Sequence, residues 1–536
     1  MTQAPVTAPA DAAPTLRRPD PVTEWAAALG ITLLAAFLRL WDLGRPHSFA
    51  FDETYYAKDA WSVYHFGYAR NYVQDADKNI LAGHVMGQWD KGAEMVVHPP
   101  VGKLLIGLGE KLFGMDPAGW RVASVVVGSL MVLVMIRFAR RVTGSSLLGL
   151  VAGLLMCFDG LQLVLSRLAL LDIFLAFFML CAVHCMVVDR DWGRSRLVDP
   201  VTGRSWGARL WWRPWRLAAG VCWGLALGSK WDAIFPLAAL CLLMWFWDAG
   251  ARRRTGVRWS LPKSAIIDEL PALGYLIVVP LLVYVASWTG WLIHHRAYEV
   301  SLSNTQYGPY WGNYLHQRTH GFVAETIRAL RDLLHYHQDV YNFHTKFLNN
   351  AHHVYQSDPQ GWLILNRPVG VDAQLGIQPG QQGCAAASGS TCLRQVLLLG
   401  TPALWWFGTA AAIWAVVTWA FRRDWRPGIV VVGIAATWLP WFRYDDRPIF
   451  SYYAIAIEPF LILGAVLLLG EILGPAPSPG QGPRAAAVLR RRYGALAAGL
   501  IVLLVALNFA YFWPIYTDGL LTNDQWLHRM WFKRWI

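Results

Sequence analysis

The chain has few charged residues for its length. Only 15% of its 536 residues are Asp, Glu, Lys or Arg, whereas 55% are hydrophobic. Soluble domains carry about 25% charged residues, so this composition excludes an ordinary soluble protein. Several uncharged apolar runs are about 20 residues long, enough to cross a hydrocarbon core of about 30 Å. The composition therefore predicts an all-α polytopic membrane protein.

Other signals are also missing from the sequence. It has no HExxH or comparably tight ligand spacing and no internal repeat of the kind that transporters show. No metal site is therefore predicted, and the histidines between 335 and 353 are expected near lipid head groups. Residues 1–24, rich in Ala, Pro and Thr, are expected to form a disordered cytoplasmic tail rather than a signal peptide. The net charge of +12 comes from basic residues between apolar runs, where topology explains it better than nucleic-acid binding.

Eleven membrane spans fit the apolar runs. They are expected near 25–43, 119–138, 147–164, 169–188, 215–229, 232–248, 270–292, 398–420, 427–442, 451–471 and 494–513. With a cytoplasmic N-terminus, every strongly basic short loop falls on the cytoplasmic side, as the positive-inside rule requires. The spans form an N-terminal module, 25–292, and a C-terminal module, 398–513, and the tail 514–536 then lies outside.

One apolar stretch does not fit this pattern. Residues 98–114, "HPPVGKLLIGLGEKLFG", carry three charges and start with two prolines, and a span here would invert all later loops. We expect an interfacial amphipathic helix instead, so that 43–119 is one long outer loop. A second outer segment, 293–397, is polar and is expected to be mainly helical. It contains Cys384 and Cys392, for which a disulfide is expected because the outer side is oxidising.

The acid pair Asp52 and Glu53 opens the first outer loop. Charges at helix ends are costly unless they pair or function, and this topology brings many of them to one membrane depth. They are Asp52, Glu53, His98, Lys103, Arg121, Arg167, Asp172, Lys230, Asp232, Arg443, Asp445, Asp446 and Arg447. Both signs are present, which suits a site that binds an anionic head group and also needs a carboxylate.

These residues also have simpler interpretations. Asp52 is suited to cap a short helix, and Arg167 and Asp172 are spaced to form an ion pair that closes a helix hairpin. Lys230 is suited to anchor a helix at the interface, and 443–447, "RYDDR", to form a solvated loop. The residues alone leave these alternatives open.

Six segments, in order, resemble the protein O-mannosyltransferases. They are "FDETYYAKDAWS", "HPPVGKLLIGLGEKLFG", "WRVASVVVGSL", "LSRLALLDIFLAFFML", "LGSKWDAIFPL" and "RPIFSYYAIAIEPF". The resemblance implies a GT-C glycosyltransferase fold, with about eleven transmembrane helices and interfacial helices in the first outer loop. The segment 293–397 is too short for the β-trefoil (MIR) domain of the eukaryotic enzymes, and in this the chain is similar to the bacterial, particularly actinobacterial, branch.

The resemblance also implies roles for individual residues. Asp52 matches the proposed catalytic base, with Glu53 as its orienting neighbour. Arg121 matches the functional arginine of the family and is expected to hold the donor phosphate, with Lys230 and Arg447 assisting. Four residues are expected to support the site: His98, Lys103, Arg167 and Asp172.

The implied activity is transfer of mannose, with inversion, from polyprenyl (dolichyl-type) phosphate mannose to Ser or Thr hydroxyls of exported proteins. It would occur at the outer face of the plasma membrane, among membrane lipids, with no cofactor and no nucleic acid. A secretion translocon as a further partner is left open. The alternative is a GT-C transferase that moves another polyprenyl-phosphate-linked sugar to a glycan or lipid. A transporter or flippase is less consistent with polar residues that gather at one face.

Overall fold

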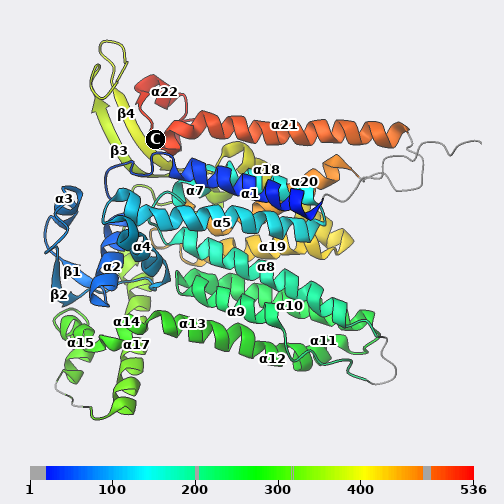
Figure 1. Ribbon diagram of the computed structural model, residues 1–536, viewed down its shortest axis with the longest axis horizontal. Coiled ribbons are helices and arrows are strands. Elements are labelled where there is room, and N and C mark those ends of the chain that lie inside the picture. Colours follow the sequence, from blue (N-terminus) through cyan, green and yellow to red (C-terminus); the bar gives the residue numbers. More distant parts are fainter. Residues whose placement is uncertain (1–19, 200–204, 316, 318, 475–484) are drawn as a thin grey trace, which may run out of the picture.

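The computed structural model describes residues 20–199, 205–315, 317, 319–474 and 485–536. Long helices run side by side as a bundle, and short helices and two small sheets gather at one end of it (Figure 1). We call this the loop end and the opposite end the basic end. Most of the predicted N-terminal tail, 1–24, lies outside the described residues, and the first helix, α1, begins within it at Pro21.

Seven segments of the described chain are long and apolar enough to cross a membrane. They are Pro21–Leu40 (α1), Pro117–Thr143 (α5), Asp172–Arg196 (α8), Trp231–Arg254 (which includes α10, Ile234–Arg254), Ser260–Ser287 (α11 to α13), Pro402–Arg422 (α18) and Ala486–Tyr516 (in α21, Ala485–Tyr516). The four other predicted spans fall on shorter helices: α6 (Ser146–Cys157) with α7 (Gly160–Leu165), α9 (Pro214–Leu227), α19 (Trp425–Trp438) and α20 (Glu458–Leu473). The chain is a multi-pass helical membrane protein, and the count of eleven spans stays a prediction.

The interior of the bundle is built by close helix contacts. Helix α8 packs along α5 and α9, and α20 packs against α18, α19 and α21. Small residues permit the closest approaches, as in other membrane helix pairs. A Cβ at Gly220 of α9, for example, would lie 1.9 Å from the Tyr275 carbonyl oxygen. Glycine at this position is therefore required by the packing of α9 on the neighbouring helix.

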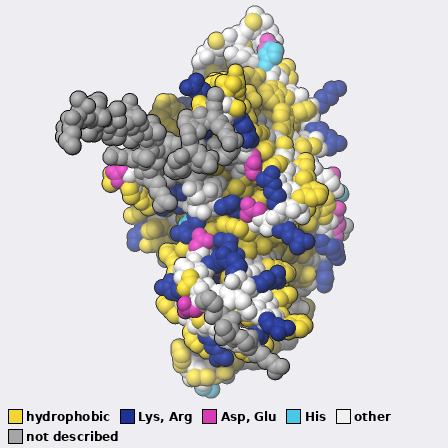
Figure 2. Space-filling model, turned by 90° about the vertical axis from the view of Figure 1, so that its right-hand side faces the viewer, with side chains coloured by type: hydrophobic (Ala, Val, Ile, Leu, Met, Phe, Trp, Pro, Cys, Tyr) yellow, Lys and Arg dark blue, Asp and Glu magenta, His cyan; other side chains and the backbone are white. Residues whose placement is uncertain are grey.

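The basic end carries most of the arginines that end the helices. Arginines occupy the last turns of α5, α8, α10 and α18, where cations also suit the helix dipole. Figure 2 views the molecule from this end and shows Lys and Arg spread across it. The clustering of basic residues at one end agrees with the loop layout that the positive-inside rule predicted.

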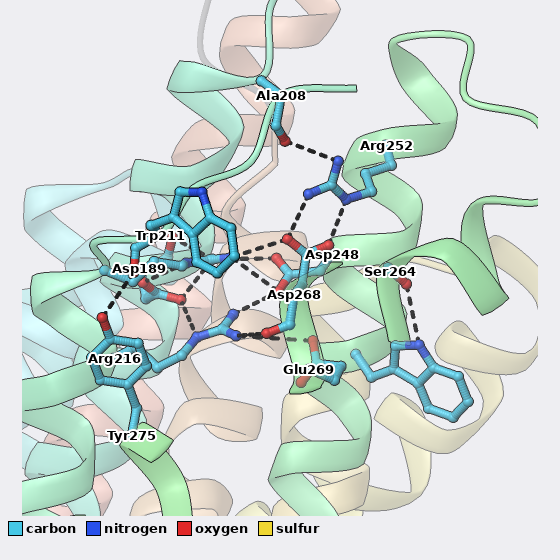
Figure 3. A network of polar contacts seen from close by, with 12 residues as sticks. Asp189, Ala208, Trp211, Arg216, Asp248, Arg252, Ser264, Asp268, Glu269 and Tyr275 are labelled. Carbon is cyan, nitrogen blue, oxygen red and sulfur yellow. Dashed lines mark hydrogen bonds and ion pairs between the residues drawn. The ribbon is translucent and has the colours of Figure 1, made fainter. Parts of the chain in front are cut away.

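A buried ionic network joins the helices at the basic end (Figure 3). Asp189 of α8 pairs with Arg213 at 2.7 Å, and Asp248 of α10 pairs with Arg216 at 2.5 Å. Arg252 binds Asp268 of the π-helical turn Ala265–Glu269 with both ends of its guanidinium. These pairs hold α8, α9, α10 and the α11–α13 segment together. Loss of any one partner would leave a buried charge unpaired, which is strongly destabilising.

The first long loop, 43–119, folds over the loop end. It forms α2 (Glu53–Phe66), β1 (Arg70–Tyr72), α3 (Ala76–Leu81), β2 (Trp89–Ala93) and α4 (Val101–Phe113), and β1 pairs with β2 in an antiparallel ribbon. Helix α4 is the predicted amphipathic helix. It buries Ile106 against the core and exposes Leu104, Leu108 and Leu112 at intervals of four, as an interfacial helix requires.

The second long loop differs in part from the prediction of a mainly helical segment. After α14 (Thr289–Ile293), which ends where this loop begins, its first half forms α15 (His295–Ser303), α16 (Gly308–Trp311) and α17 (Phe322–Thr345). Its last part is an antiparallel hairpin of β3 (Val369–Ile377) and β4 (Cys392–Leu398), to which β5 (Leu521–Thr522) adds a third strand next to α22 (Asn523–Leu527). A disulfide joins Cys384 to Cys392. The hairpin corrects the prediction of a mainly helical segment, and its third strand comes from the far end of the sequence.

Candidate active site

Glu53 is fully buried at the start of α2. Its Oε2 accepts from the backbone N–H of Ala50 at 2.9 Å, and its Oε1 accepts from that of Ala169 at 2.8 Å. Arg121 of α5 completes the arrangement, with Nε–Oε1 at 2.8 Å and Nη2–Oε2 at 2.7 Å. Glu53 thus joins the start of α2 to α5 and to the turn before α8, and its oxygens are fully occupied.

Arg121 is fully engaged within the protein. Besides Glu53, it donates to the carbonyls of Leu43, Pro46 and Ser48, at 3.2, 2.9 and 3.0 Å. A guanidinium has five N–H donors, and each of them is used here. The expected contact with the donor phosphate is therefore not available to Arg121, which instead shapes the segment that leads to the acid pair.

Asp52 lies next to Glu53 but is bound far more loosely. It is the residue before the first turn of α2, yet its side chain accepts no backbone N–H, so the capping alternative does not apply. Its carboxylate accepts from the Tyr56 hydroxyl at 3.3 Å. Burial raises the pKa of Asp52 to about 6, the nearby Lys230 lowers it, and Asp172 raises it further. The carboxylate is partly buried, and a pKa of about 6 leaves it mostly ionised at neutral pH.

Lys230 follows α9 and is almost completely buried. Its Nζ lies 2.8 Å from Asp172 Oδ1, at the start of α8, and 4.4 Å from the centre of the Tyr453 ring. Burial disfavours the charged amine, but the Asp172 carboxylate outweighs burial and raises the pKa of Lys230. The ammonium is thus held charged close to Asp52. Because it is buried in an ion pair, Lys230 does not extend to water as an interface anchor would.

Arg167 does not pair with Asp172, contrary to the simpler interpretation of their spacing. It donates instead to the carbonyls of Arg39 and Asp42 at 3.0 and 3.2 Å. These carbonyls belong to the C-terminal end of α1, where backbone acceptors lack helical partners. Arg167 therefore closes α1 and supports the site only from a distance.

A cavity of about 220 Å³ lies beside Lys230. Its lining includes two cations, Lys230 and Arg447, and aromatic side chains such as Trp441 and Tyr453. Asp52 is not itself part of this lining. Tyr56, whose hydroxyl binds Asp52, packs its ring near the ring of the cavity residue His98, with centroids 6.0 Å apart. Asp232 also lines the cavity.

Two neutral histidines accompany the cations. His344 Nδ1 accepts from Arg447 Nη1 at 3.2 Å, while its Nε2 donates to the Val97 carbonyl at 3.1 Å. Burial and Arg447 together lower the pKa of His344 to about 4, and burial with Lys230 lowers the pKa of His98 well below its usual value. The Nε of Arg447 is buried without a hydrogen-bond partner. Arg447 therefore has a free N–H donor that could bind an anion in the cavity.

The remaining predicted residues lie elsewhere. Lys103 of α4 pairs with Asp59 of α2 at 2.7 Å, with both side chains buried, and so joins two loop-end helices. Arg443 and Asp445 are exposed, and Asp446 accepts from Asn349 at 3.0 Å. The prediction had not singled out two tyrosines that the structure places in the site. They are Tyr56, within "FDETYY", and Tyr453, within "RPIFSYY".

One group of three side chains in the described chain has the spacing of metal ligands: His295, Glu299 and Asp332. Arg328 already binds Glu299 through both oxygens, at 2.7 and 2.5 Å. Burial disfavours the charged ring of His295, but hydrogen bonds with carboxylates outweigh it and raise its pKa to about 9. With Arg328 on Glu299 and the His295 ring between carboxylates, this group forms an ionic cluster.

Comparison with known proteins places the chain in a family. The model described as dolichyl-phosphate-mannose-protein mannosyltransferase matches residues 118–295, and that of the C-terminal four TMM region of protein-O-mannosyltransferase matches 329–535. The polyprenol-phosphate-mannose–protein mannosyltransferase of Mycolicibacterium smegmatis is 36% identical, over 100% of this chain and 96% of its own. That of Corynebacterium glutamicum is 31% identical, over 95% and 93%.

The fold is also that of a solved member of this family. The S. cerevisiae protein O-mannosyltransferase Pmt1–Pmt2 complex bound to the sugar donor superposes with a TM-score of 0.68 at 14% identity, over 97% of this chain and 94% of the other. This likeness confirms the GT-C fold that the sequence predicted. The chain therefore belongs to the dolichyl-phosphate-mannose-protein mannosyltransferase family.

Proposed function

We propose that the chain transfers mannose from polyprenyl-phosphate mannose to Ser or Thr hydroxyls of exported proteins. Membership of the family and the names of its mycobacterial and corynebacterial relatives support this donor and acceptor. One structural observation carries the proposal. Asp52, whose carboxylate accepts one hydrogen bond from Tyr56 at 3.3 Å, lies close to Lys230, and Lys230 lines a cavity together with a second cation, Arg447.

Asp52 is the general base of the proposed reaction. A Ser or Thr hydroxyl must lose its proton as it attacks the anomeric carbon, and this requires a base within hydrogen-bond reach. A carboxyl with a pKa of about 6 is ionised at neutral pH and is a stronger base than an ordinary aspartate. Glu53 cannot share this task because Arg121 and two backbone N–H groups occupy it; it positions Asp52 instead.

Lys230 and Arg447 stabilise the leaving group. As the new carbon–oxygen bond forms, the bond between the anomeric carbon and the phosphate oxygen breaks, and its electron pair stays on the lipid phosphate. The phosphate thereby gains a negative charge, which positioned cations stabilise in the transition state. A single displacement of this kind inverts the configuration at the anomeric carbon. With two cations supplying this charge, we propose that the reaction requires no divalent metal.

The proposed orientation puts the loop end outside the cell. Basic segments between spans stay in the cytoplasm, and the arginines of the basic end follow this rule. The Cys384–Cys392 disulfide at the opposite end suits an oxidising compartment. Asp52 would then face polypeptides that emerge across the plasma membrane.

The test uses the purified full chain in lipid nanodiscs with labelled polyprenyl-phosphate mannose and a peptide rich in Ser and Thr. We expect mannosyl-peptide with inverted anomeric configuration, formed equally well with and without EDTA. Transfer to glycan or lipid acceptors but to no peptide would instead support the other class of GT-C transferase. Loss of transfer in EDTA that Mg²⁺ or Mn²⁺ restores would contradict the metal-independent mechanism.

A further inference from the structure

Helix α17 exposes an apolar stripe from Val323 to Leu334, with Tyr341 two turns further on the same face. Val323, Ile327, Leu330, Leu334 and Tyr341 are 70, 63, 44, 75 and 54% exposed. At about 100° per residue, these five positions fall within about 60° of one another around the helix. The helix is outside the candidate membrane spans. An apolar stripe of this length facing water is unfavourable and marks an interaction surface.

The opposite face of α17 is polar and covered by α15. Arg328 binds Glu299 of α15 through both oxygens, and Asp332 Oδ2 lies 3.2 Å from His295 Nδ1 of the same helix. In Figure 1, α15 lies to the left of α17, on the side away from the long helices. The stripe therefore faces the side toward which the spans extend.

The helix also lies at the level where a candidate span ends. In Figure 1 it runs across the direction of the spans, next to the end of α13 (Val279–Ser287). Tyr284 and Trp288 at this end contact α17: the Tyr284 hydroxyl lies 2.5 Å from His337 Nε2, and the Trp288 ring packs on Tyr336 with centroids 5.9 Å apart. Tyrosine and tryptophan are enriched at the membrane surface. Helix α17 runs across the direction of the spans at the level where one of them ends, and this orientation is parallel to the membrane surface.

The stripe leads directly to the candidate active site. Tyr341, its last residue, lines the cavity together with His344 and Thr345 of the same helix, and Lys230 and Arg447 lie in that lining. Helix α17 therefore connects the stripe to the cavity that the two cations line.

We propose that α17 is a membrane-docking helix whose apolar stripe inserts among the lipid head groups and upper acyl chains. Docking holds the cavity at the level of the lipid phosphates, so that a lipid-linked donor reaches Lys230 and Arg447 while its chain stays in the bilayer. This consequence rests on the proposed function, whereas the docking itself does not. The occupant is lipid because the stripe faces the layer that the neighbouring spans cross, and amphipathic helices bind there in proportion to their buried apolar area.

The docking is tested with the full chain in vesicles of phosphatidylethanolamine and phosphatidylglycerol that contain a lipid with a photoreactive group on its acyl chain. After irradiation, mass spectrometry maps the lipid adducts. We expect adducts on Val323 to Leu334 as well as on α1, and none at Leu375, an exposed apolar residue of the β3–β4 hairpin. A stripe as free of adducts as Leu375, with α1 labelled in the same sample, would overturn the docking.

A pair of variants tests the consequence for activity. Ile327→Glu combined with Leu334→Glu places charge in the stripe, and Gln338→Glu places it at an exposed position beside the stripe on the same helix. We expect the double variant to lose about tenfold in transfer from a long-chain donor in vesicles, and to keep wild-type transfer from a short-chain donor in detergent. Gln338→Glu is expected to transfer normally from both donors.

Each other result has a defined meaning. Normal long-chain transfer by the double variant would overturn the role in holding the cavity, even with lipid adducts on the stripe. A dimer in detergent that only the double variant dissociates would assign the stripe to a second copy and overturn the proposal. A wild-type chain that acquires adducts on the stripe but transfers no mannose would refute the proposed function and leave the docking supported.

Discussion

Glu53 and Arg121 form an ion pair in which neither side chain is exposed to solvent, with Nη2 and Oε2 2.7 Å apart. The pair separates the tasks of two adjacent acids. Glu53 is held by four donors and fixes the backbone at the start of α2, whereas Asp52, one residue earlier, keeps its carboxylate available beside Lys230. Neighbouring residues of the same charge thus have different surroundings: Glu53 is held in a structural ion pair, and Asp52 is the proposed base.

Replacement of the proposed base should remove chemistry without removing the fold. Asp52→Asn keeps the size of the side chain but cannot accept the proton of the acceptor hydroxyl. General bases contribute about 10²- to 10⁴-fold, so we expect kcat to fall within that range. Thermal unfolding and binding of the lipid-linked donor should stay near wild type. A kcat of the Asp52→Asn variant within about twofold of wild type, far less than a general base contributes, would assign the base elsewhere.

Replacement of the neighbouring acid should have the opposite signature. Glu53→Gln leaves Arg121 buried without its counter-charge, and loss of one partner of a buried ion pair costs about 3–5 kcal/mol. We therefore expect a clear drop in the thermal unfolding temperature in detergent, larger than that of Asp52→Asn. The double variant Glu53→Gln, Arg121→Met removes both charges and should regain part of the stability. Equal stability of the two single variants would contradict the division of roles.

The phosphate-binding role of Arg447 is tested against a nearby arginine. Arg447 lines the cavity and has a buried, unpaired Nε, whereas Arg443 is exposed on the same segment. A charge-assisted hydrogen bond contributes about 1.5–3 kcal/mol, so Arg447→Gln should reduce kcat/KM for the donor by about 10- to 150-fold. Arg443→Gln should have little effect. Similar losses in both variants would indicate a general effect of surface charge.

The activity should depend on pH through Asp52. A base works in its ionised form, and the pKa of Asp52 is about 6. Transfer should therefore be constant above about pH 7 and fall tenfold per pH unit well below pH 6, since the protonated carboxyl accepts no proton. The residual activity of Asp52→Asn should lack this dependence. An identical acid limb in that variant would show that another group titrates.

The stability should depend on pH through His295. The ionic cluster raises its pKa from 6.5 to about 9, so its contribution is fully present below about pH 6.5 and is lost as the pH rises through 9. A shift of this size corresponds to about 3 kcal/mol. Thermal unfolding between pH 6 and pH 10 should show the loss, and His295→Gln should reduce the slope. An unchanged slope in this variant would exclude His295 as its source.

The sequence predicted the architecture well where a single physical pattern decided it. Long uncharged runs and one-sided basic loops were sufficient for the multi-pass helical fold, and the charges and prolines of 98–114 correctly excluded a span and predicted the amphipathic helix α4. The hairpin β3–β4 was missed, and the addition of β5 to it was beyond prediction because that pairing joins residues more than 120 positions apart. Local patterns carry no information on such pairing.

The order of the apolar runs and basic loops was enough to predict which charged residues lie at the loop end. It also showed that Asp52 and Glu53 open the first loop. The partners of these residues followed from the packing of the helices. Arg121 binds Glu53, Lys230 binds Asp172, and Arg167 closes α1. The reason is that buried charges must find opposite charges or backbone dipoles, and helix packing decides which of these lie within reach. A list of charged residues therefore predicts a site, and the packing separates those that hold it together from those left free to react.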